Sequence, residues 1–264
     1  MVFHYASISG ERTTEGKLYF QPTFFQHQKT YSFCTKYTTS KRVLDAGCGT
    51  GAGAFLLSKT AKEIVAVDTD RDAIEYSRKM YKRRNLTYKR IGVLDIRDKK
   101  KFNTVVSLQV IEHIEEVDTY LAKIKDFLKP KGIAIFSTPN SLTQSYNENP
   151  YHVHEYLAEE LLILLKKYFQ TVHLYGLHGD KIVLRYERAR KKFIIPLLQL
   201  DIFRLRNFLP KTIVQRLFDF ATIFCRLFFA TENNSKKRIS MKNYKINRQT
   251  ENAIDLIAVC RDPK

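Results

Sequence analysis

The residues best suited to chemistry lie together in a glycine-rich turn that follows an acid. A short apolar run, residues 43–44, ends in Asp45, and Gly47-Cys48-Gly49-Thr50-Gly51 comes directly afterwards. Glycines have no Cβ, so the backbone N–H groups of such a turn can approach a ligand closely, and the following helix directs its N-terminus at that ligand. The turn predicts a binding site for a nucleoside-containing cofactor.

A second acid lies where a nucleoside needs one. Asp68 ends the apolar run 64–67, 17 residues after Gly51. A carboxylate at that place can accept hydrogen bonds from both hydroxyls of a ribose. The competing role for Asp68 is to cap the next helix, but Thr69 or Asp70 can do this and leave Asp68 free.

Acidic and imidazole side chains follow two later apolar runs. Glu112 and His113 come after residues 104–108, and His152 and His154 come after residues 132–137. If both runs are parallel strands, these side chains meet at the carboxyl edge of one sheet. Carboxylate and imidazole side chains can act as general bases, so these four residues are candidate catalytic residues. The alternative role for His113 is to brace a loop.

The pattern that must position these residues is an alternation of strands and helices from residue 41 to about residue 178. It predicts an α/β fold with a doubly wound, mostly parallel, seven-stranded sheet. The expected strands are 43–45, 64–67, 88–91, 104–108, 132–137, 171–175 and 253–259. The expected helices are 53–62, 70–84, 118–128 and 158–168.

Three regions follow from this pattern. Residues 1–40 form an N-terminal segment, residues 41–179 with 251–264 form the cofactor-binding domain, and residues 180–250 form a basic helical insertion before the last strand. Within the insertion, residues 213–227 have the spacing of an amphipathic helix. Such a helix packs on its own domain, covers an apolar substrate or lies on an anionic membrane.

The composition is that of a basic globular protein. Hydrophobic residues make up 44% of the chain, and 45 Lys and Arg against 27 Asp and Glu give a formal net charge of +18. Residues 180–264 hold 19 of the basic residues and 8 of the acidic ones. Such an excess of positive charge attracts nucleic acid or anionic lipid. The alternative is that the charge only keeps the protein soluble.

The remaining features bear on location. The four cysteines form no Cys-x-x-Cys pair, and the first ten residues do not resemble a signal peptide. Charged residues interrupt every long apolar run. We therefore expect a cytoplasmic protein without a membrane span, with peripheral contact at a membrane surface as an added role.

Two cofactors fit the glycine turn by itself. Gly49-Thr50-Gly51 with Ala54 satisfies a loose form of the dinucleotide pattern. Asp45 and the downstream segments 66–68, 102–107, 110–114, 128–132 and 137–140 argue against NAD. Together with the turn, they resemble the class I S-adenosylmethionine-dependent methyltransferases over residues 41 to about 178 and 253–259.

The resemblance implies roles in binding S-adenosylmethionine. Asp45 would face the ammonium group, Asp68 would hold the ribose, and Gln109 would lie beside the sulfonium. Asp95 with Ile96 would meet the adenine, with Gly92 as the alternative. The full set of implied cofactor residues is Asp45, Gly47, Gly49, Thr50, Gly51, Asp68, Thr69, Asp95, Ile96 and Gln109.

Residues 110–113 also resemble the metal-binding segment of small-RNA 3′-terminal ribose methyltransferases. That segment begins with a glutamate where this chain has Gln109, which offers no anionic oxygen to a hard cation. We therefore predict no metal, although Glu112, His113 and one of His152 or His154 remain.

The acceptor is suggested by a resemblance to quinone and cell-surface glycan O-methyltransferases. Ser9-Gly10-Glu11-Arg12 and Phe25-Gln26-His27 are similar to the N-terminal region of bacterial members associated with polysaccharide synthesis. The expected activity is O-methylation of a glycan, lipid-linked or quinone-like hydroxyl. The alternatives are methylation of RNA at a terminal ribose, and a non-catalytic protein that binds the cofactor or a partner.

Overall fold

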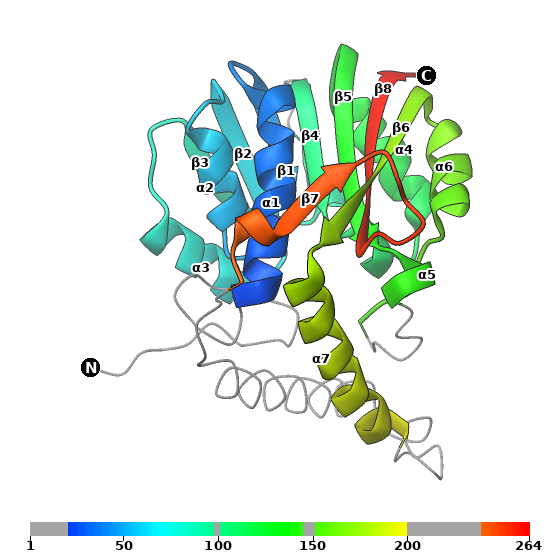
Figure 1. Cartoon of the computed structure of the whole chain (residues 1–264). Coiled ribbons are helices and arrows are strands. Elements are labelled where there is room, and N and C mark those ends of the chain that lie inside the picture. Colours follow the sequence, from blue (N-terminus) through cyan, green and yellow to red (C-terminus); the bar gives the residue numbers. More distant parts are fainter. Residues whose placement is uncertain (1–20, 98–100, 145–150, 200–238) are drawn as a thin grey trace, which may run out of the picture.

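One mixed sheet organises the molecule in the computed structural model, which describes residues 21–97, 101–144, 151–199 and 239–264 (Figure 1). In these residues the sheet has eight strands in the order β3-β2-β1-β4-β5-β8-β6-β7. The strands are β1 (Arg42–Ala46), β2 (Glu63–Asp68), β3 (Leu86–Arg90), β4 (Phe102–Leu108), β5 (Leu128–Pro139), β6 (Phe169–Gly179), β7 (Tyr244–Asn247) and β8 (Asp255–Pro263).

The strand directions confirm the predicted α/β fold and correct one detail. Strands β1 to β5 pair in parallel, whereas β8 runs antiparallel between β5 and β6. The predicted count of seven strands is wrong, because β7 adds an antiparallel edge strand beside β6. It lies inside the stretch 180–250 that we expected to be helical, and its four residues are too few to show an alternating pattern.

Helices cover both faces of the sheet. They are α1 (Gln21–Thr38), α2 (Ala52–Ser58), α3 (Arg71–Met80), α4 (Val117–Phe127), α5 (Ser141–Gln144), α6 (Ala158–Lys166) and α7 (Lys181–Gln199). One apolar cluster joins the sheet to α1, α2 and α3, and a second joins it to α4 and α6. This two-layer covering is what a mostly parallel sheet requires, since both of its faces are apolar.

Helix α1 belongs to the core, although residues 1–40 show no periodic pattern. Its side chains Tyr31, Cys34 and Tyr37 are buried against the sheet. The hydroxyl of Thr104 on β4 donates to the carbonyl of Tyr37 over 2.8 Å. The boundary that we predicted at residue 40 therefore separates elements that share one core.

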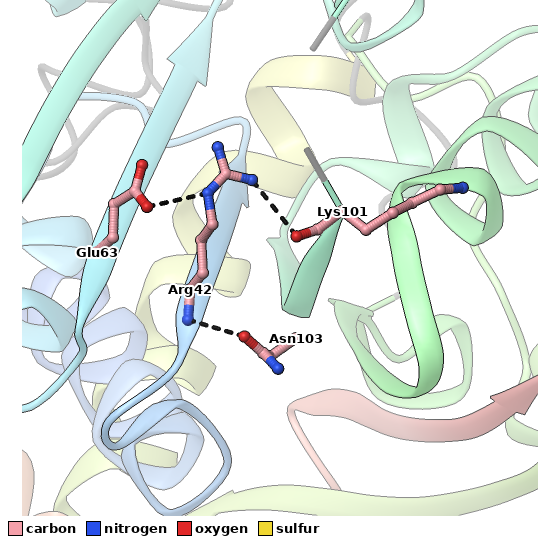
Figure 2. Close-up of polar contacts among 4 residues, drawn as sticks. All are labelled: Arg42, Glu63, Lys101 and Asn103. Carbon is pink, nitrogen blue, oxygen red and sulfur yellow. Dashed lines mark hydrogen bonds and ion pairs between the residues drawn. The ribbon is translucent and has the colours of Figure 1, made fainter. Parts of the chain in front are cut away.

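The amino end of β1 is fixed by Arg42 (Figure 2). Its Nε lies 2.9 Å from Glu63 Oε2 on β2, and its backbone N–H donates to Asn103 Oδ1 on β4 over 3.1 Å. The guanidinium also stacks 4.1 Å above the Phe102 ring centroid. These contacts hold β1 between its two neighbours at the end of the strand opposite the glycine turn.

The carboxyl ends of the parallel strands lie at the lower edge of the sheet in Figure 1, where α5 follows β5 and α7 leaves β6. Residues 9–12 and the amphipathic stretch 213–227 lie outside the described residues. Among the helices of the described ranges, none is long and apolar enough to cross a membrane.

Candidate functional site

The glycine turn has the backbone that the sequence required. Gly47, Gly49 and Gly51 have φ angles of 84°, 52° and 85°, in the left-handed region that other residues rarely adopt. A Cβ on Gly47 would lie 2.4 Å from Val110, and one on Gly51 would lie 2.5 Å from Ser77. A Cβ on Gly49 would meet nothing within 4 Å. Gly49 therefore faces open space at the carboxyl edge.

Asp45 lies at the end of β1, fully buried, and is held by a residue that sequence reasoning missed. The hydroxyl of Tyr31 on α1 lies 3.1 and 3.2 Å from the two carboxylate oxygens of Asp45. Burial raises the pKa of Asp45 to about 7, and the hydrogen bond from Tyr31 opposes part of that rise. Neighbouring positive charge would therefore favour the ionised form of Asp45 strongly.

Asp68 supports the glycine turn directly. Its Oδ2 accepts a hydrogen bond from the N–H of Gly49 over 2.8 Å, and its Oδ1 accepts one from the N–H of Asp70 over 3.0 Å. Asp70, one of the two residues that we considered for this role, caps α3 by accepting from the N–H of Ala73. Asp68 is thus released from capping but orders the turn, with further lone pairs left for a ligand. Thr50 is buried, whereas Thr69 is exposed.

Of the residues after β3 that we expected to contact the adenine, Asp95 lies at the surface and Ile96 lies in the core. Asp95 ends a short 3₁₀ turn, Val93–Asp95, and is exposed. Its Oδ2 would lie 2.9 Å from a Cβ on Gly92, so both candidates for the adenine contact are neighbours. Ile96 instead packs in the apolar cluster beneath α4.

Gln109 follows β4 in a left-handed conformation with a φ of 55°. Its backbone N–H donates to the carbonyl of Ser137 over 2.8 Å, and its Nε2 lies 3.3 Å from Ser137 Oγ. The same side chain lowers the pKa of Asp255 at the start of β8. Gln109 therefore links the carboxyl ends of β4 and β5.

Three of the four candidate catalytic residues converge. Ligand atoms of Glu112, His113 and His152 lie within 4.8 Å of one another. The backbone explains this, because the N–H of Val153 donates to the carbonyl of Glu112 over 2.7 Å. His154 points elsewhere, with its Nε2 at 2.6 Å from Glu160 Oε1 and its ring against Tyr156.

The two clustered histidines are oriented through their Nδ1 atoms. His113 Nδ1 lies 2.8 Å from the carbonyl of Tyr151, and His152 Nδ1 lies 2.9 Å from Glu155 Oε1. A carbonyl only accepts, so Nδ1 of His113 donates this hydrogen bond. His113 therefore braces the loop through Nδ1, which is the alternative role that we considered for it.

The same cluster has a donor set that fits a metal ion. Two imidazoles and a carboxylate suit a divalent transition metal better than Mg²⁺, which prefers oxygen ligands. The acceptors on both Nδ1 atoms are the outer-shell partners that metal-binding histidines use. Our prediction of no metal stays a prediction.

A further acid lies at this edge. Asp255 opens β8 and is 2% exposed, and Gln26 on α1 donates to its Oδ2 over 2.8 Å. Burial, together with the charge of Glu187 on α7, raises the pKa of Asp255 to about 7. The signal in the sequence was an acid inside the apolar run 253–259.

Comparisons with known proteins agree with the motif series. A family model described as a methyltransferase domain matches residues 38–222. A probable S-adenosylmethionine-dependent methyltransferase of Mycobacterium tuberculosis is 32% identical over 182 residues, which cover 67% of this chain and 66% of that protein. A ubiquinone biosynthesis O-methyltransferase of Rickettsia typhi is 32% identical over 108 residues, which cover 40% of this chain and 44% of that protein.

A solved structure shares the fold. The N-methyltransferase NodS of Bradyrhizobium japonicum, in complex with S-adenosylhomocysteine, superposes with a TM-score of 0.56 at 13% identity, over 97% of this chain and 95% of its own. The family match over residues 38–222 carries the assignment. The chain belongs to the class I S-adenosylmethionine-dependent methyltransferases, a family whose cofactor is S-adenosylmethionine.

Proposed function

We propose that this protein transfers the methyl group of S-adenosylmethionine to a hydroxyl of a glycan, lipid-linked or quinone-like acceptor. The observation that carries the proposal is the open face of Gly49, whose N–H donates to Asp68, in the turn that follows Asp45. When bound, the cofactor supplies an activated methyl group on a sulfonium.

The cofactor residues would act by charge and by shape. Asp45 would hold the ammonium group, which would stabilise its ionised form in a buried position. Gly47, Gly49 and Gly51 would admit the methionine part, and Asp68 would use its remaining lone pairs on the ribose. Asp95 would meet the adenine, and Gln109 would lie beside the sulfonium.

The acceptor would bind at the carboxyl edge near Glu112, His113 and His152. Methyl transfer is an in-line displacement, so alignment of the acceptor supplies much of the catalysis, and a hydroxyl also needs a base. The rickettsial relative is named for O-methylation in ubiquinone biosynthesis, which supports a hydroxyl acceptor.

A charged helix supports an acceptor at an anionic membrane surface. Lys181, Arg185, Arg188 and Lys192 recur every three or four residues along α7 and are exposed, whereas Val183 and Tyr186 are buried. Helix α7, which carries this basic stripe, leaves the sheet at the same edge as the candidate site (Figure 1). Attraction of basic residues to anionic lipid contributes about 1 kcal/mol each.

The test is transfer of label from methyl-labelled S-adenosylmethionine to a lysate separated into lipid, polysaccharide, RNA and protein fractions. We expect label in the lipid or polysaccharide fraction, with or without a chelator, because Gln109 supplies no anionic ligand. Failure of the protein to bind the cofactor at millimolar concentration would overturn the proposal. So would binding without label in any fraction, the behaviour of a non-catalytic protein.

RNA methylation is the second candidate, favoured by the charge of +18 and by the Glu112-His113-His152 cluster. It predicts label in RNA and RNA binding that weakens steeply as salt rises. Label confined to lipid or polysaccharide would exclude RNA as the main acceptor.

A further inference from the structure

Asp255 is a buried acid at the carboxyl edge of the sheet, where it opens β8. Its register partners are Pro139 at the end of β5 and Leu177 near the end of β6. The side chain of Gln26 on α1 donates to it over 2.8 Å, and the side chain of Gln109, in the loop after β4, lowers its pKa. Asp255 is thus electrostatically coupled to Gln109, the residue that we propose lies beside the sulfonium.

The segment before β8 fixes the position of Asp255. Asn140, after β5, donates from its side chain to the carbonyls of Thr250 and Ala253 over 2.9 and 3.0 Å. Its backbone N–H donates to the carbonyl of Ile254 over 3.0 Å. These three hydrogen bonds leave the carboxylate at a defined point of the edge, which is what a group that meets a reacting atom requires.

A purely structural role explains Asp255 poorly. A neutral residue could bond the amide of Gln26 without the cost of burying a carboxyl group. The second acid that faces Asp255, Glu187 on α7, is also buried, so like charges approach each other in a chain with a net charge of +18. Such an arrangement keeps a carboxyl group ready to exchange a proton near neutral pH.

We propose that Asp255 binds the acceptor hydroxyl and removes its proton during methyl transfer. The inference rests on the proposed function and names the base for it. The acceptor O–H proton passes to the Asp255 carboxylate, the oxygen forms a bond to the methyl carbon, and the carbon–sulfur bond breaks. The electron pair of that bond stays on sulfur, so S-adenosylhomocysteine leaves as a neutral thioether.

The clustered histidines fit a different task. The Nδ1 atoms of His113 and His152 hold the loop through Tyr151 and Glu155, and both rings lie on the Glu112 side of the edge. Asp255 approaches from β8, on the face that α1 covers. Substitution of Asp255 and substitution of a clustered histidine therefore test two different candidates for the base.

The test uses methyl-labelled S-adenosylmethionine and the lysate fraction that the wild-type protein labels. Asp255→Asn should lower kcat by about 10²- to 10⁴-fold, the usual contribution of a general base, with the Kd for S-adenosylmethionine unchanged. Asp262→Asn, the same change at the far end of β8, is the matched control. Thermal melting shows whether Asp255→Asn folds, which we expect because asparagine resembles the protonated acid.

Gln26→Leu separates a base from a structural residue. The hydrogen bond from Gln26 lowers the pKa of Asp255, so its loss should move the midpoint of the kcat–pH profile upward and leave the plateau at high pH in place. A structural residue would lower the melting temperature without moving the midpoint.

The outcomes are distinct. No label with the wild-type protein overturns the proposed function, and the inference with it. Label with the wild type and undiminished kcat in folded Asp255→Asn overturns only the inference, as does a pH profile that Asp255→Asn and Gln26→Leu leave unmoved. In that case loss of activity in His113→Asn would identify the histidine as the base.

Discussion

Two buried carboxylates, each hydrogen-bonded by α1, define the chemistry at the scale of single residues. Tyr31 donates to Asp45 and Gln26 donates to Asp255, and burial raises the pKa of each acid to about 7. Each donor lowers the pKa of its partner. One helix therefore adjusts the charge of both the proposed cofactor site and the proposed acceptor site.

Tyr31→Phe should weaken cofactor binding in a pH-dependent way. Without the hydroxyl, the pKa of Asp45 rises further, and less of it is ionised at neutral pH to meet the ammonium group. We expect the Kd for S-adenosylmethionine to rise about tenfold near pH 7 and to recover partly near pH 8, since a hydrogen bond to a charged group contributes about 1.5–3 kcal/mol. Isothermal titration calorimetry measures this change in Kd.

The control is Tyr37→Phe, on the same helix, which should leave the Kd for S-adenosylmethionine unchanged. Equal losses of affinity in both variants would contradict the role that we assign to Tyr31.

The same acids predict how stability depends on pH. Their pKa is higher in the folded protein than the ordinary value of 3.8, so the folded state binds protons more tightly than the unfolded state. This contribution is complete below about pH 4 and is lost as the pH rises through about 7. We expect the melting temperature of the cofactor-free protein to fall over that range, and to fall less in Asp255→Asn. A parallel pH dependence in the two proteins would show that Asp255 ionises normally.

At the scale of elements, the contact between α1 and α2 places Tyr31. A Cβ on Gly53 would lie 2.1 Å from Cε2 of the Tyr31 ring. The absence of a side chain at Gly53 therefore lets the ring reach Asp45. This contact joins the N-terminal helix to the glycine turn, because Gly53 follows Gly51 by two residues.

Gly53→Ala should destabilise the protein and weaken cofactor binding. In an ordinary helix this change stabilises by about 0.5–1 kcal/mol, whereas here the added methyl group displaces the Tyr31 ring. We expect a lower melting temperature and a higher Kd for S-adenosylmethionine. In a Tyr31→Ala background the same change should no longer destabilise, which a double-mutant cycle measures. Equal effects in both backgrounds would mean that Tyr31 is not the neighbour that matters.

The sequence predicted those elements whose pattern is local. The turn after β1 needs glycine at three left-handed positions, and the buried parallel strands are continuous apolar runs, so both are visible in the chain. Helix α1 was not predicted because most of its buried residues are polar or aromatic and its apolar period is weak. The pair Gln26 and Asp255 could not be predicted, since 229 residues separate its members and only the sheet order brings them together.

At the scale of the whole molecule, the positive charge is placed unevenly. Residues 180–264 hold 19 Lys and Arg against 8 Asp and Glu. The basic stripe of α7 begins two residues after β6 and so lies at the same edge as the proposed acceptor site. If the stripe binds an anionic membrane, the proposed acceptor site therefore lies close to that membrane. This arrangement suits an acceptor that is embedded in or attached to anionic lipid.

Reversing two charges of the stripe should release the protein from anionic membranes. We expect the wild type to bind vesicles that contain phosphatidylglycerol and to dissociate as salt is raised, because exposed charges are screened. Arg185→Glu with Arg188→Glu should lower the partition coefficient by at least about 30-fold, because each basic residue contributes about 1 kcal/mol to membrane binding.

The control is Lys82→Glu with Arg83→Glu, which changes the net charge equally at an exposed site before β3. Vesicle co-sedimentation measures both. Equal losses would mean that net charge alone drives binding, and the stripe would then have no special part in bringing the acceptor to the site.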